Sequence, residues 1–430
     1  MNVYDELEQR GFIYQCTDPD GLRELLAKEQ VTYYIGFDPT GGSLHVGSLV
    51  PIMAMVHMQG AGHRTIALMG GGTAMVGDPS GKNEMRRMIS REVIDRNAVG
   101  IKAQFEQYLD FGEGRAVLLN NLDWLLPLNY IEFLRTIGRH MSVNRMMARE
   151  SARLRYESAD GLSLLEFNYA CLQAYDFYVL ARDHGCALQM GGRDQWGNIC
   201  EGIDLIGRQD LGGRKAYGLT LPLLVGPGGD KFGKTVKGSV WLDAKLTQPF
   251  DFYQFWRNTE DTEVERYLKL FTLLPLDEIR RLGALKPPMI NRAKEILAFE
   301  ITMLAHGFET AGDVFAGAIN EFGSADPEGT VETSSRIGEV AVSATGEGAV
   351  PTFDLEKGET GQGLAVIDLL VKAGMCRSKG EARRFIQGGG VYLNNARVAA
   401  ADAEVTLDDF KDGTAFLKIG KKTVKKIRLK

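Results

Sequence analysis

The chain has 430 residues, 44% of them hydrophobic and 25% charged, and a formal net charge of −6. This length exceeds what one hydrophobic core usually organises, so two or three folding units are expected. The composition excludes an intrinsically disordered chain. The acidic start MNVYDELEQR and the absence of an apolar run of about eighteen residues argue against secretion and membrane spanning.

The five cysteines are widely spaced and contain no C-x-x-C pair. An odd number in this arrangement indicates neither a disulfide framework nor a zinc site. We therefore expect a cytoplasmic protein without a metal site.

A negative net charge argues against a nucleic-acid partner, but a sum over the chain does not report local patches. The tail KKTVKKIRLK holds six lysines and arginines in ten residues, and residues 145–155 hold four arginines in eleven. Runs of charge are usually solvated faces, so a solvated surface and a contact with a polyanion both stay open.

In chain order, residues 1–225 alternate short apolar strands with amphipathic helices. Strands are predicted at 32–37 and around RTIALMG and ALQMG, with a helix over LVPIMAMVHMQGAG between the first two. This alternation predicts an α/β fold, a Rossmann-like doubly wound parallel sheet with helices on both faces.

Four further regions follow the predicted sheet. Residues 226–248 form a loop region with lysines and glycines, and residues 249–322 have the three- and four-residue apolar spacing of an all-α domain. Residues 323–350 are rich in Gly, Ser, Thr and Glu, the composition of a linker or a loosely packed segment. Residues 351–430 recover apolar periodicity and predict a small α+β domain that ends in the basic tail.

The first chemical signal is YIGFDPTGGSLHVGS, residues 34–48. A strand runs into a Gly, Pro and Asp turn, and a helix is expected to begin near His45. Helix N-terminal N–H groups attract anions, Gly47 lets a nucleotide approach the backbone, and Thr40 and His45 add donors. Pro51 inside the expected helix predicts a local kink. An ordinary strand–turn–helix with a surface histidine is the alternative interpretation.

The glycine-rich run MGGGTAMVGDPSGK, residues 69–82, does not fit a Walker motif. That motif needs four residues between its glycines and a Ser or Thr after the lysine. The interpretation that remains is a sharp loop at a strand end that carries Asp78, with Lys82 and Arg86 one helical turn apart. A turn followed by a solvated basic face is the alternative.

A helix is predicted over NYACLQAYDFYVL, in which Tyr169, Gln173 and Asp176 fall at i, i+4 and i+7 and so line one face. Its other positions are mostly apolar, and a polar stripe on a buried helix costs free energy unless it finds partners. A ligand site and a structural hydrogen-bond network both meet this requirement.

Two later segments extend the pattern. In LQMGGRDQWGN, residues 188–198, a strand ends in a Gly-Gly turn and a helix opens with Asp194 and Gln195. Open α/β sheets bind ligands at such strand ends. In DKFGKTVKGS, residues 230–239, two lysines stand three apart among glycines without helical or strand periodicity. This describes a mobile cationic loop.

Taken in this order, the five segments resemble the bacterial-type tyrosyl-tRNA synthetase family of class I synthetases, over essentially the whole chain. Residues 45–48, His-Val-Gly-Ser, resemble the HIGH signature, and residues 231–235 resemble the KMSKS loop in its KFGKS-type form. Ser48 departs from the signature, because it replaces the second histidine.

The resemblance implies roles for individual residues. Those implied in tyrosine binding are Tyr34 and Asp176 at the phenol, Asp78, Tyr169 and Gln173 at the ammonium group, and Gln189 and Gln195. Those implied in ATP or adenylate binding are Gly36, Asp38, Thr40, His45, Gly47, Ser48, Gly192, Asp194 and Lys234. Those implied in catalysis are Thr40, His45, Lys82, Arg86, Lys231 and Lys234.

Residues 363–395 resemble an RNA-binding module shared with a ribosomal small-subunit protein. Arginines and lysines of such a module contact tRNA phosphates, which positions the RNA without specifying its sequence. A small surface domain with solvated arginines is the alternative. The residues implied in RNA binding are Arg377, Lys379, Arg383 and Arg384, together with Arg145 and Arg149 of the earlier arginine run.

The implied reaction joins L-tyrosine to ATP and then transfers tyrosine to the 3′ end of tRNA(Tyr). A tyrosine carboxylate is already ionised at neutral pH, so its attack on the α-phosphorus needs positioning and charge stabilisation but no general base. ATP would bring Mg²⁺ as a substrate ion, and no tightly bound cofactor is expected. The resemblance also implies a homodimer.

Two rival functions stay open. Another class I activating enzyme, such as a tryptophanyl or pantoate-type ligase, is expected to lack the pairing of Tyr34 with Asp176. An RNA-binding scaffold that has lost catalysis is expected to lack His45, Lys231 and Lys234, all of which are present.

Overall fold

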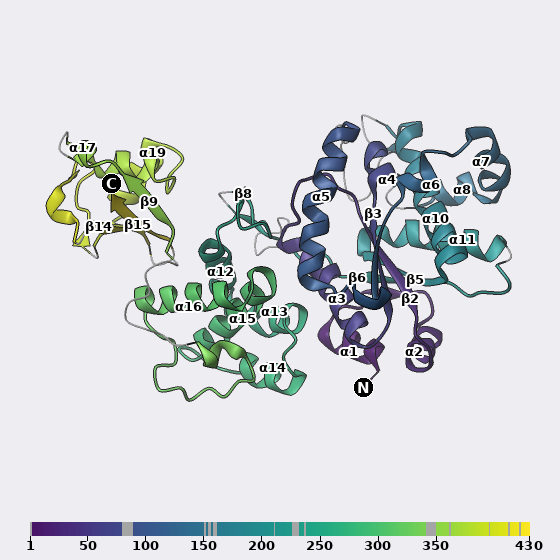
Figure 1. Ribbon diagram of the computed structural model, residues 1–430, viewed down its shortest axis with the longest axis horizontal. Coiled ribbons are helices and arrows are strands. Elements are labelled where there is room, and N and C mark those ends of the chain that lie inside the picture. The colour runs from purple at the N-terminus through teal and green to yellow at the C-terminus, as the bar shows by residue number, and fades with distance from the viewer. Residues whose placement is uncertain are drawn as a thin grey trace. The chain divides into compact units, whose positions relative to one another are not determined.

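The computed structural model describes most of the chain (Figure 1). It forms two compact units, Met1–Leu246 with Arg266–Leu276, and Thr247–Glu265 with Asp277–Lys430, which we call the first and the second unit. At residues 234 and 235 only the backbone is described. The described residues are 2–79, 89–149, 152–153, 156–157, 161–209, 211–225, 232–235, 238–340, 350–360, 363–394, 396–411, 413–420 and 423–430.

A six-stranded sheet forms the centre of the first unit, with the strand order β1-β6-β5-β2-β3-β4. Neighbouring strands are parallel except for β1 and β6, which are antiparallel. The doubly wound parallel sheet predicted from the sequence is therefore confirmed. The strands are β1 (Gln15–Cys16), β2 (Thr32–Phe37), β3 (Arg64–Met69), β4 (Ala116–Asn120), β5 (Cys186–Gly192) and β6 (Tyr217–Leu221).

Helices cover both faces of this sheet (Figure 1). Side chains alternate between the faces of a strand, and β2 follows this rule. Tyr33 donates its hydroxyl proton to the carbonyl of Met55 in α3, whereas Tyr34 packs its ring against Phe177 in α10. Burial of both faces explains why β2 reads as a continuous apolar run. The helices are α1 (Val3–Arg10), α2 (Pro19–Lys28), α3 (Leu49–Gly60), α4 (Gly71–Val76), α5 (Arg91–Tyr108), α6 (Leu122–Leu125), α7 (Tyr130–Thr136), α8 (Val143–Met147), α10 (Leu164–His184) and α11 (Trp196–Arg208).

The helix after β2 begins later than the sequence predicted. A 3-10 turn, Val46–Ser48, comes first, and α3 starts at Leu49. Pro51 therefore lies in the first turn of α3, where backbone N–H groups have no partner within the helix. The prediction of a kink assumed an interior proline and is wrong on that point.

The lysine loop also differs from its prediction. Residues 234–239 contain a short antiparallel pair, β7 (Lys234–Thr235) with β8 (Gly238–Ser239). The sequence showed no strand periodicity there, because two residues per strand are too few to establish one.

The second unit begins with a group of helices. Its central helix, α15, is buried on most sides, and Phe299 and Ile296 are fully enclosed. Its buried charged side chains have partners, since Glu295 pairs with Arg292 and Glu300 accepts from Ser335. The helices are α12 (Pro249–Arg257), α14 (Leu276–Gly283), α15 (Ile290–His306) and α16 (Phe308–Phe322), while most of α13 (Val264–Phe271) belongs to the first unit.

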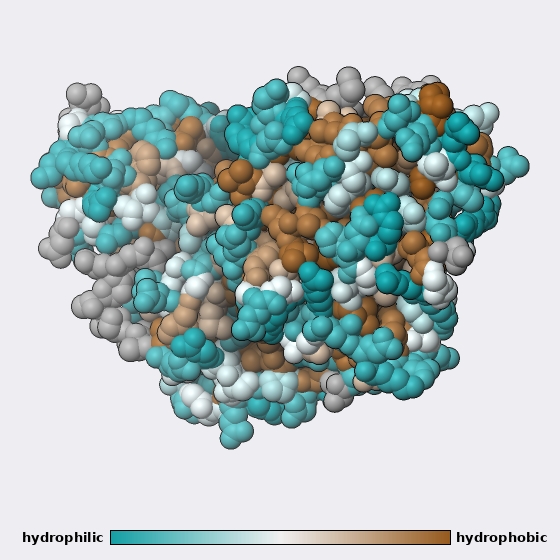
Figure 2. Space-filling model, turned by 45° about the vertical axis from the view of Figure 1, so that its right-hand side comes forward, coloured by the Kyte–Doolittle hydropathy of each residue, from teal (hydrophilic) through white to brown (hydrophobic). Residues whose placement is uncertain are grey.

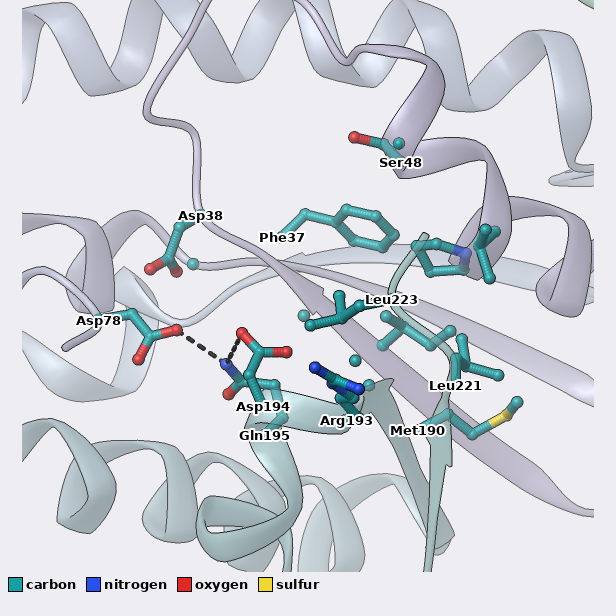
Figure 3. Close-up of a pocket in the computed structure, with 18 of the residues that line it drawn as sticks. Phe37, Asp38, Ser48, Asp78, Met190, Arg193, Asp194, Gln195, Leu221 and Leu223 are labelled. Atoms are coloured by element: carbon teal, nitrogen blue, oxygen red, sulfur yellow. Dashed lines mark hydrogen bonds between the residues drawn. The ribbon is translucent and has the colours of Figure 1, made fainter. Parts of the chain in front are cut away.

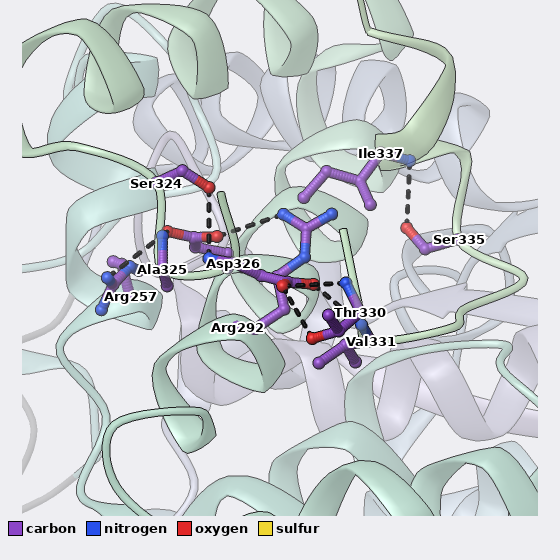
Figure 4. A network of polar contacts seen from close by, with 10 residues as sticks. Arg257, Arg292, Ser324, Ala325, Asp326, Thr330, Val331, Ser335 and Ile337 are labelled. Carbon is purple, nitrogen blue, oxygen red and sulfur yellow. Dashed lines mark hydrogen bonds and ion pairs between the residues drawn. The ribbon is translucent and has the colours of Figure 1, made fainter. Parts of the chain in front are cut away.

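Residues 324–337 lie against these helices through a polar network (Figure 4). The carboxylate of Asp326 accepts the backbone N–H of Thr330 at 2.9 Å, and Glu278 of α14 accepts the hydroxyl proton of Thr333 at 2.6 Å. The composition indicated a linker or a loosely packed segment. This part of it instead finds hydrogen-bond partners on helices distant in the sequence, which local composition cannot report.

The last part of the second unit is a small α+β domain. A five-stranded sheet with the order β12-β11-β14-β15-β9 packs against α18 and α19 around an apolar core that includes Leu369, Ile386 and Leu417. Its elements are β9 (Thr352–Leu355), α17 (Lys357–Thr360), β10 (Leu364–Ala365), α18 (Val366–Lys372), α19 (Lys379–Gln387), β11 (Val391–Leu393), β12 (Ala396–Arg397), β13 (Glu404–Val405), β14 (Thr414–Ile419) and β15 (Thr423–Leu429).

Within the described ranges, no helix is long and apolar enough to cross a membrane. The same residues contain no group of three or more His, Cys, Asp and Glu side chains placed to hold a metal ion.

Candidate active site

A pocket of about 570 Å³ opens at the carboxyl ends of β2 and β5. The strand order reverses between these two strands, and such switch points are where open α/β sheets bind ligands. The residues expected at the tyrosine and ATP sites whose side chains are described all line this pocket: Tyr34, Gly36, Asp38, Thr40, His45, Gly47, Ser48, Asp78, Tyr169, Gln173, Asp176, Gln189, Gly192, Asp194 and Gln195.

One end of the pocket combines two buried side chains, Tyr34 of β2 and Asp176 of α10. The carboxylate of Asp176 accepts the indole N–H of Trp124 at 2.7 Å and the amide N–H of Asn121 at 2.9 Å. Among the described residues, the hydroxyl of Tyr34 and the amide oxygen of Gln189 are buried without a hydrogen-bond partner. A buried polar atom left unpaired costs about 1–3 kcal/mol, so these atoms are suited to a polar ligand.

Burial controls the ionisation of both groups. It raises the pKa of Asp176 to about 7, although the hydrogen bonds from Asn121 and Trp124 act in the opposite direction. Burial, and then the nearby charge of Asp176, raise the pKa of Tyr34 well above its ordinary value. The Tyr34 hydroxyl therefore stays protonated at neutral pH and keeps its capacity as a donor.

A second group of polar side chains lies beside this end of the pocket. Tyr169 of α10 donates its hydroxyl proton to Asp38 at 3.0 Å, and Thr73 of α4 donates to the other oxygen of Asp38 at 2.8 Å. Asn121 also donates to Thr73, at 3.0 Å. The end of β2 is thus joined to α4 and α10 by direct hydrogen bonds.

A third group joins the Asp78 loop to the end of β5 (Figure 3). The amide of Gln195 donates to Asp78 at 2.8 Å. Asn198 of α11 donates both to Gln173 of α10 at 3.0 Å and to the amide oxygen of Gln195 at 3.2 Å. With Asp38 and Asp194 also present, this part of the pocket is acidic and suits a cationic group such as an ammonium.

The other end of the pocket is formed by the turn after β2. The Nδ1 atom of His45 accepts the backbone N–H of Gly47 at 3.0 Å. A Cβ atom at Gly47 would come within 2.7 Å of the His45 ring, so a larger residue would displace the ring that accepts this hydrogen bond. At Gly36 an added Cβ would meet nothing within 4 Å, which leaves the floor of the pocket open to a flat ligand.

The backbone joins this turn to the lysine loop. Val46 donates its N–H to the carbonyl of Val240 at 3.0 Å, and Leu242 donates to Leu44 at 2.9 Å. Phe232, at the start of the loop, lines the pocket. Lys82, Arg86 and Lys231 lie outside the described residues, as does the side chain of Lys234.

Two of the arginines expected to contact RNA, Arg145 and Arg149, do not line this pocket and are paired with carboxylates. Arg149 pairs with the fully buried Glu201, and Arg145 pairs with Asp204 at 2.5 Å. A phosphate at either arginine would have to compete with these carboxylates. The other expected residues are exposed in the α+β domain, at the beginning of α19 and along it: Arg377, Lys379, Arg383 and Arg384.

Sequence reasoning missed four polar residues of the site, Thr73, Asn121, Trp124 and Asn198. Three of them belong to short elements or strand ends that lack a periodic pattern. Asn198 follows Gln195 by three residues, so helical spacing alone would have placed both on one face.

Comparison with known proteins agrees with this geometry. Residues 26–323 match the family described as "tRNA synthetases class I (W and Y)", and residues 343–426 match the "Tyrosine--tRNA ligase SYY-like C-terminal domain". The fold and the pocket therefore define a class I aminoacyl-tRNA synthetase.

Curated relatives narrow this class. The chain is 51% identical over 430 residues to the tyrosine–tRNA ligase of Desulfatibacillum aliphaticivorans, covering 100% of this chain and 99% of that protein. It is 47% identical over 428 residues to the tyrosine–tRNA ligase of Acetivibrio thermocellus, again covering 100% of this chain and 99% of that protein. The chain belongs to the tyrosyl-tRNA synthetase family, which uses ATP.

Solved structures are consistent with this assignment. A C-terminally truncated mitochondrial tyrosyl-tRNA synthetase of Aspergillus nidulans superimposes with a TM-score of 0.66 at 31% identity, over 74% of this chain and 93% of that chain. The tryptophanyl-tRNA synthetase of Giardia lamblia, at 16% identity and a TM-score of 0.55 over 71% of this chain and 85% of that one, shares the fold alone.

Proposed function

We propose that the chain activates L-tyrosine with ATP, forming tyrosyl-adenylate and pyrophosphate, and then transfers tyrosine to the 3′ end of tRNA(Tyr). The observation that carries this proposal is the buried pair of Tyr34 and Asp176 at one end of the pocket. A phenol placed there would accept from the unpaired Tyr34 hydroxyl and donate to the Asp176 carboxylate. An indole N–H can only donate, and a phenyl group can do neither, so this pair favours tyrosine.

The rest of the pocket is compatible with the other atoms of tyrosyl-adenylate. The ammonium group of tyrosine would lie near Asp78, Tyr169 and Gln173, and the ribose and carboxylate near Asp38, Asp194 and Gln195. The adenine would lie over the open floor at Gly36 and Gly47. The phosphates would lie near His45 and Thr40. One extended ligand would in this way span the whole pocket.

Catalysis in this proposal rests on positioning and charge. Tyrosine carboxylate attacks the α-phosphorus of ATP, and pyrophosphate leaves with the electrons of the broken P–O bond. Thr40 and His45 donate to the phosphates, and Lys82, Arg86, Lys231 and Lys234 supply positive charge as the negative charge grows on the leaving group. Mg²⁺ arrives bound to ATP as part of the substrate.

The α+β domain would hold tRNA. Arg377, Arg383 and Arg384 are exposed just before α19 and along it, where they can approach phosphates. Lys379 is also exposed but pairs with Asp368. The basic tail contributes less than its composition suggested, because Arg428 and Lys430 both pair with Asp354.

A cytoplasmic homodimer is the assembly that we propose. The helices α7, α8 and α10 pack together around Phe133, Met146 and Ala174. Their outer sides expose large apolar residues, and Figure 2 shows hydrophobic side chains on that face of the molecule. Monomeric proteins rarely expose a large group of apolar side chains on one face. A two-fold dimer would cover the same surface on both copies. The exposed residues are Leu126, Tyr130, Ile131, Leu134, Val143, Leu164 and Leu165.

The decisive experiment is ATP–pyrophosphate exchange with tyrosine, tryptophan and phenylalanine as alternative substrates. Tyrosine-dependent exchange with little response to the other two supports the proposal. Exchange with tryptophan would favour the tryptophanyl alternative. The absence of exchange with every amino acid would favour an RNA-binding scaffold without catalysis.

A further inference from the structure

A polar cluster in the first unit, with two buried members and one half-buried member, does not line the pocket described above. It consists of Glu6 and Arg10 on α1 and His57 near the end of α3. Arg10 is only 4% exposed, and its Nε atom donates to Glu6 at 3.0 Å. The same oxygen of Glu6 lies 3.4 Å from Nδ1 of His57. Hydrogen bonds from His57 and Arg10 hold the pKa of Glu6 at about 2, so its carboxylate is ionised at neutral pH.

The guanidinium of Arg10 also binds the end of α13, far away in the sequence. It donates to the carbonyls of Lys269 at 3.3 Å, Thr272 at 3.2 Å and Leu274 at 2.9 Å. The last four carbonyls of a helix have no partner within it, and a cation at this end interacts favourably with the helix dipole. Arg10 therefore acts as a C-terminal cap for α13 that is supplied by another helix.

The helix that Arg10 caps supports the wall of the pocket. Tyr267 and Phe271 of α13 both contact the ring of Phe232, with centroids 5.3 Å and 6.2 Å away. Phe232 is 8% exposed and lines the pocket directly after Lys231. Phe232 thus transmits the position of α13 to the beginning of the lysine loop.

The other side of the cluster holds α3. The turn that precedes α3 carries His45 and Gly47, and His57 lies eight residues after the helix begins at Leu49. At 1.5 Å per residue this is about 12 Å, so the cluster does not touch a ligand in the pocket. Glu6 contacts His57 on α3, the helix that follows the His45 turn. Its partner Arg10 contacts α13, the helix that packs against Phe232.

We propose that Arg10 and Glu6 are positioning residues for the ATP-dependent step, because they hold α3 and α13 so that the His45 turn and Phe232 keep a fixed relative position. This inference rests on the proposed function, since it specifies what the nucleotide end of that site requires. The phenol end, formed by Tyr34 on β2 and Asp176 on α10, has no contact with the cluster in the described residues. The cluster should therefore affect ATP and leave tyrosine binding unchanged.

The test uses the full-length chain with Arg10→Lys and, separately, Phe271→Leu. Lysine keeps the positive charge but cannot reach three carbonyls at once, and leucine removes the ring stacked on Phe232. We expect kcat/KM for ATP in pyrophosphate exchange to fall about 10- to 100-fold, as small misplacements near a reacting centre do. The Kd of tyrosine, measured by titration calorimetry, should stay within about two-fold. Arg115→Lys is the matched control, because Arg115 forms an exposed ion pair with Asp110 and belongs to neither α1 nor α13.

The double variant separates positioning from general damage. If Arg10 acts through α13, the loss in Arg10→Lys/Phe271→Leu should be smaller than the product of the two single losses. A multiplicative loss overturns the proposal, as does an unchanged kcat/KM for ATP or an equal loss of tyrosine affinity. Wild-type chain without exchange would refute the proposed function instead. Thermal melting of each variant checks that it folds. If Arg10→Lys does not fold, the kinetics of Phe271→Leu alone test the proposal.

Discussion

Trp124 donates its indole N–H to Asp176 at 2.7 Å, and this contact fixes the orientation of a carboxylate that lines the pocket. Asn121 holds the second oxygen of the same carboxylate at 2.9 Å. A phenol entering beside Tyr34 would therefore meet an acceptor whose geometry is already set. Acceptors that need no reorganisation contribute most to binding and to specificity.

Replacement of Asp176 with asparagine should severely impair tyrosine activation. An amide presents one acceptor instead of two, so its N–H₂ group would face the donor of either Asn121 or Trp124. We expect kcat/KM for tyrosine in the exchange assay to fall at least about 100-fold. The preference for tyrosine over phenylalanine, known to be roughly 10⁵ in tyrosyl-tRNA synthetases, should fall with it. A variant with the wild-type preference would contradict the phenol assignment.

Tyr34→Phe provides a graded companion to that variant. It removes one neutral hydrogen bond and leaves the ring that packs on Phe177. A loss of about 3- to 10-fold in tyrosine affinity follows from a neutral hydrogen bond of about 1 kcal/mol. Its melting temperature should not fall, because the hydroxyl has no partner to lose among the described residues.

The raised pKa of Asp176 predicts opposite effects of pH on binding and on stability. Below the pKa of about 7 the free carboxyl is protonated and is a poorer acceptor for a phenol. The Kd of tyrosine should therefore rise as pH falls below 7, approaching tenfold per unit.

Stability should change in the other direction. The folded pKa lies above the ordinary value of 3.8, so the ionised side chain disfavours folding at pH above 7. This penalty is relieved as pH falls from 7 towards 3.8. Calorimetric titration with tyrosine and urea unfolding, both followed against pH, test the two trends, and Asp176→Asn should flatten the second. A tyrosine Kd that is independent of pH between about 5.5 and 8 would argue against the shift.

Local periodicity predicted those parts of the site that lie on one element. The strand Thr32–Phe37 has the predicted bounds, and the i, i+4, i+7 spacing brings Tyr169, Gln173 and Asp176 to one pocket. Trp124 and Asn121 could not be found this way. They belong to the end of β4 and the four-residue helix α6, and they reach Asp176 across more than 50 residues of sequence. Such pairs depend on the tertiary fold and leave no local pattern.

Local composition could not predict the contacts of the described residues that follow α16. A segment rich in serine, threonine and glycine is expected to be poorly ordered, because these residues bury little apolar surface. In the structure their hydroxyl and N–H groups bind carboxylates of α14 and α15, such as Ser335 on Glu300 at 2.5 Å. The order of this region comes from partners elsewhere in the chain.

Lys234→Ala tests the lysine loop. Lys234 is expected to supply positive charge to the departing pyrophosphate and to make no contact with the phenol end. The rate of adenylate formation in a single-turnover experiment should fall about 10- to 1,000-fold, the range for loss of one charged donor. The Kd of tyrosine should change little, and a large loss of tyrosine affinity would be inconsistent with this role.

Glu278→Ala tests the packing of residues 324–337. Glu278 accepts three hydrogen bonds, from Thr333 and from the N–H and hydroxyl of Ser334. Their removal should destabilise this segment by about 2–4 kcal/mol and raise its hydrogen exchange and proteolysis. Glu339→Gln, which breaks an exposed ion pair with Arg336, is the matched control and should have little effect. Unchanged hydrogen exchange of residues 324–337 in Glu278→Ala would show that apolar packing alone holds the segment.

Removal of residues 351–430 should separate the two steps of the reaction. The sheet, the pocket and the family match at 26–323 all precede this cut, so tyrosine-dependent exchange should persist. Aminoacylation of tRNA(Tyr) should be lost, because the exposed arginines of α19 leave with the domain. The double variant Arg383→Glu/Arg384→Glu should reproduce this loss within the full chain, most strongly at low salt, where contacts with phosphates contribute most to binding. Arg428→Gln is its control, since Arg428 is already paired with Asp354. Full aminoacylation by the truncated chain would remove the domain from the reaction and assign tRNA binding to other surfaces.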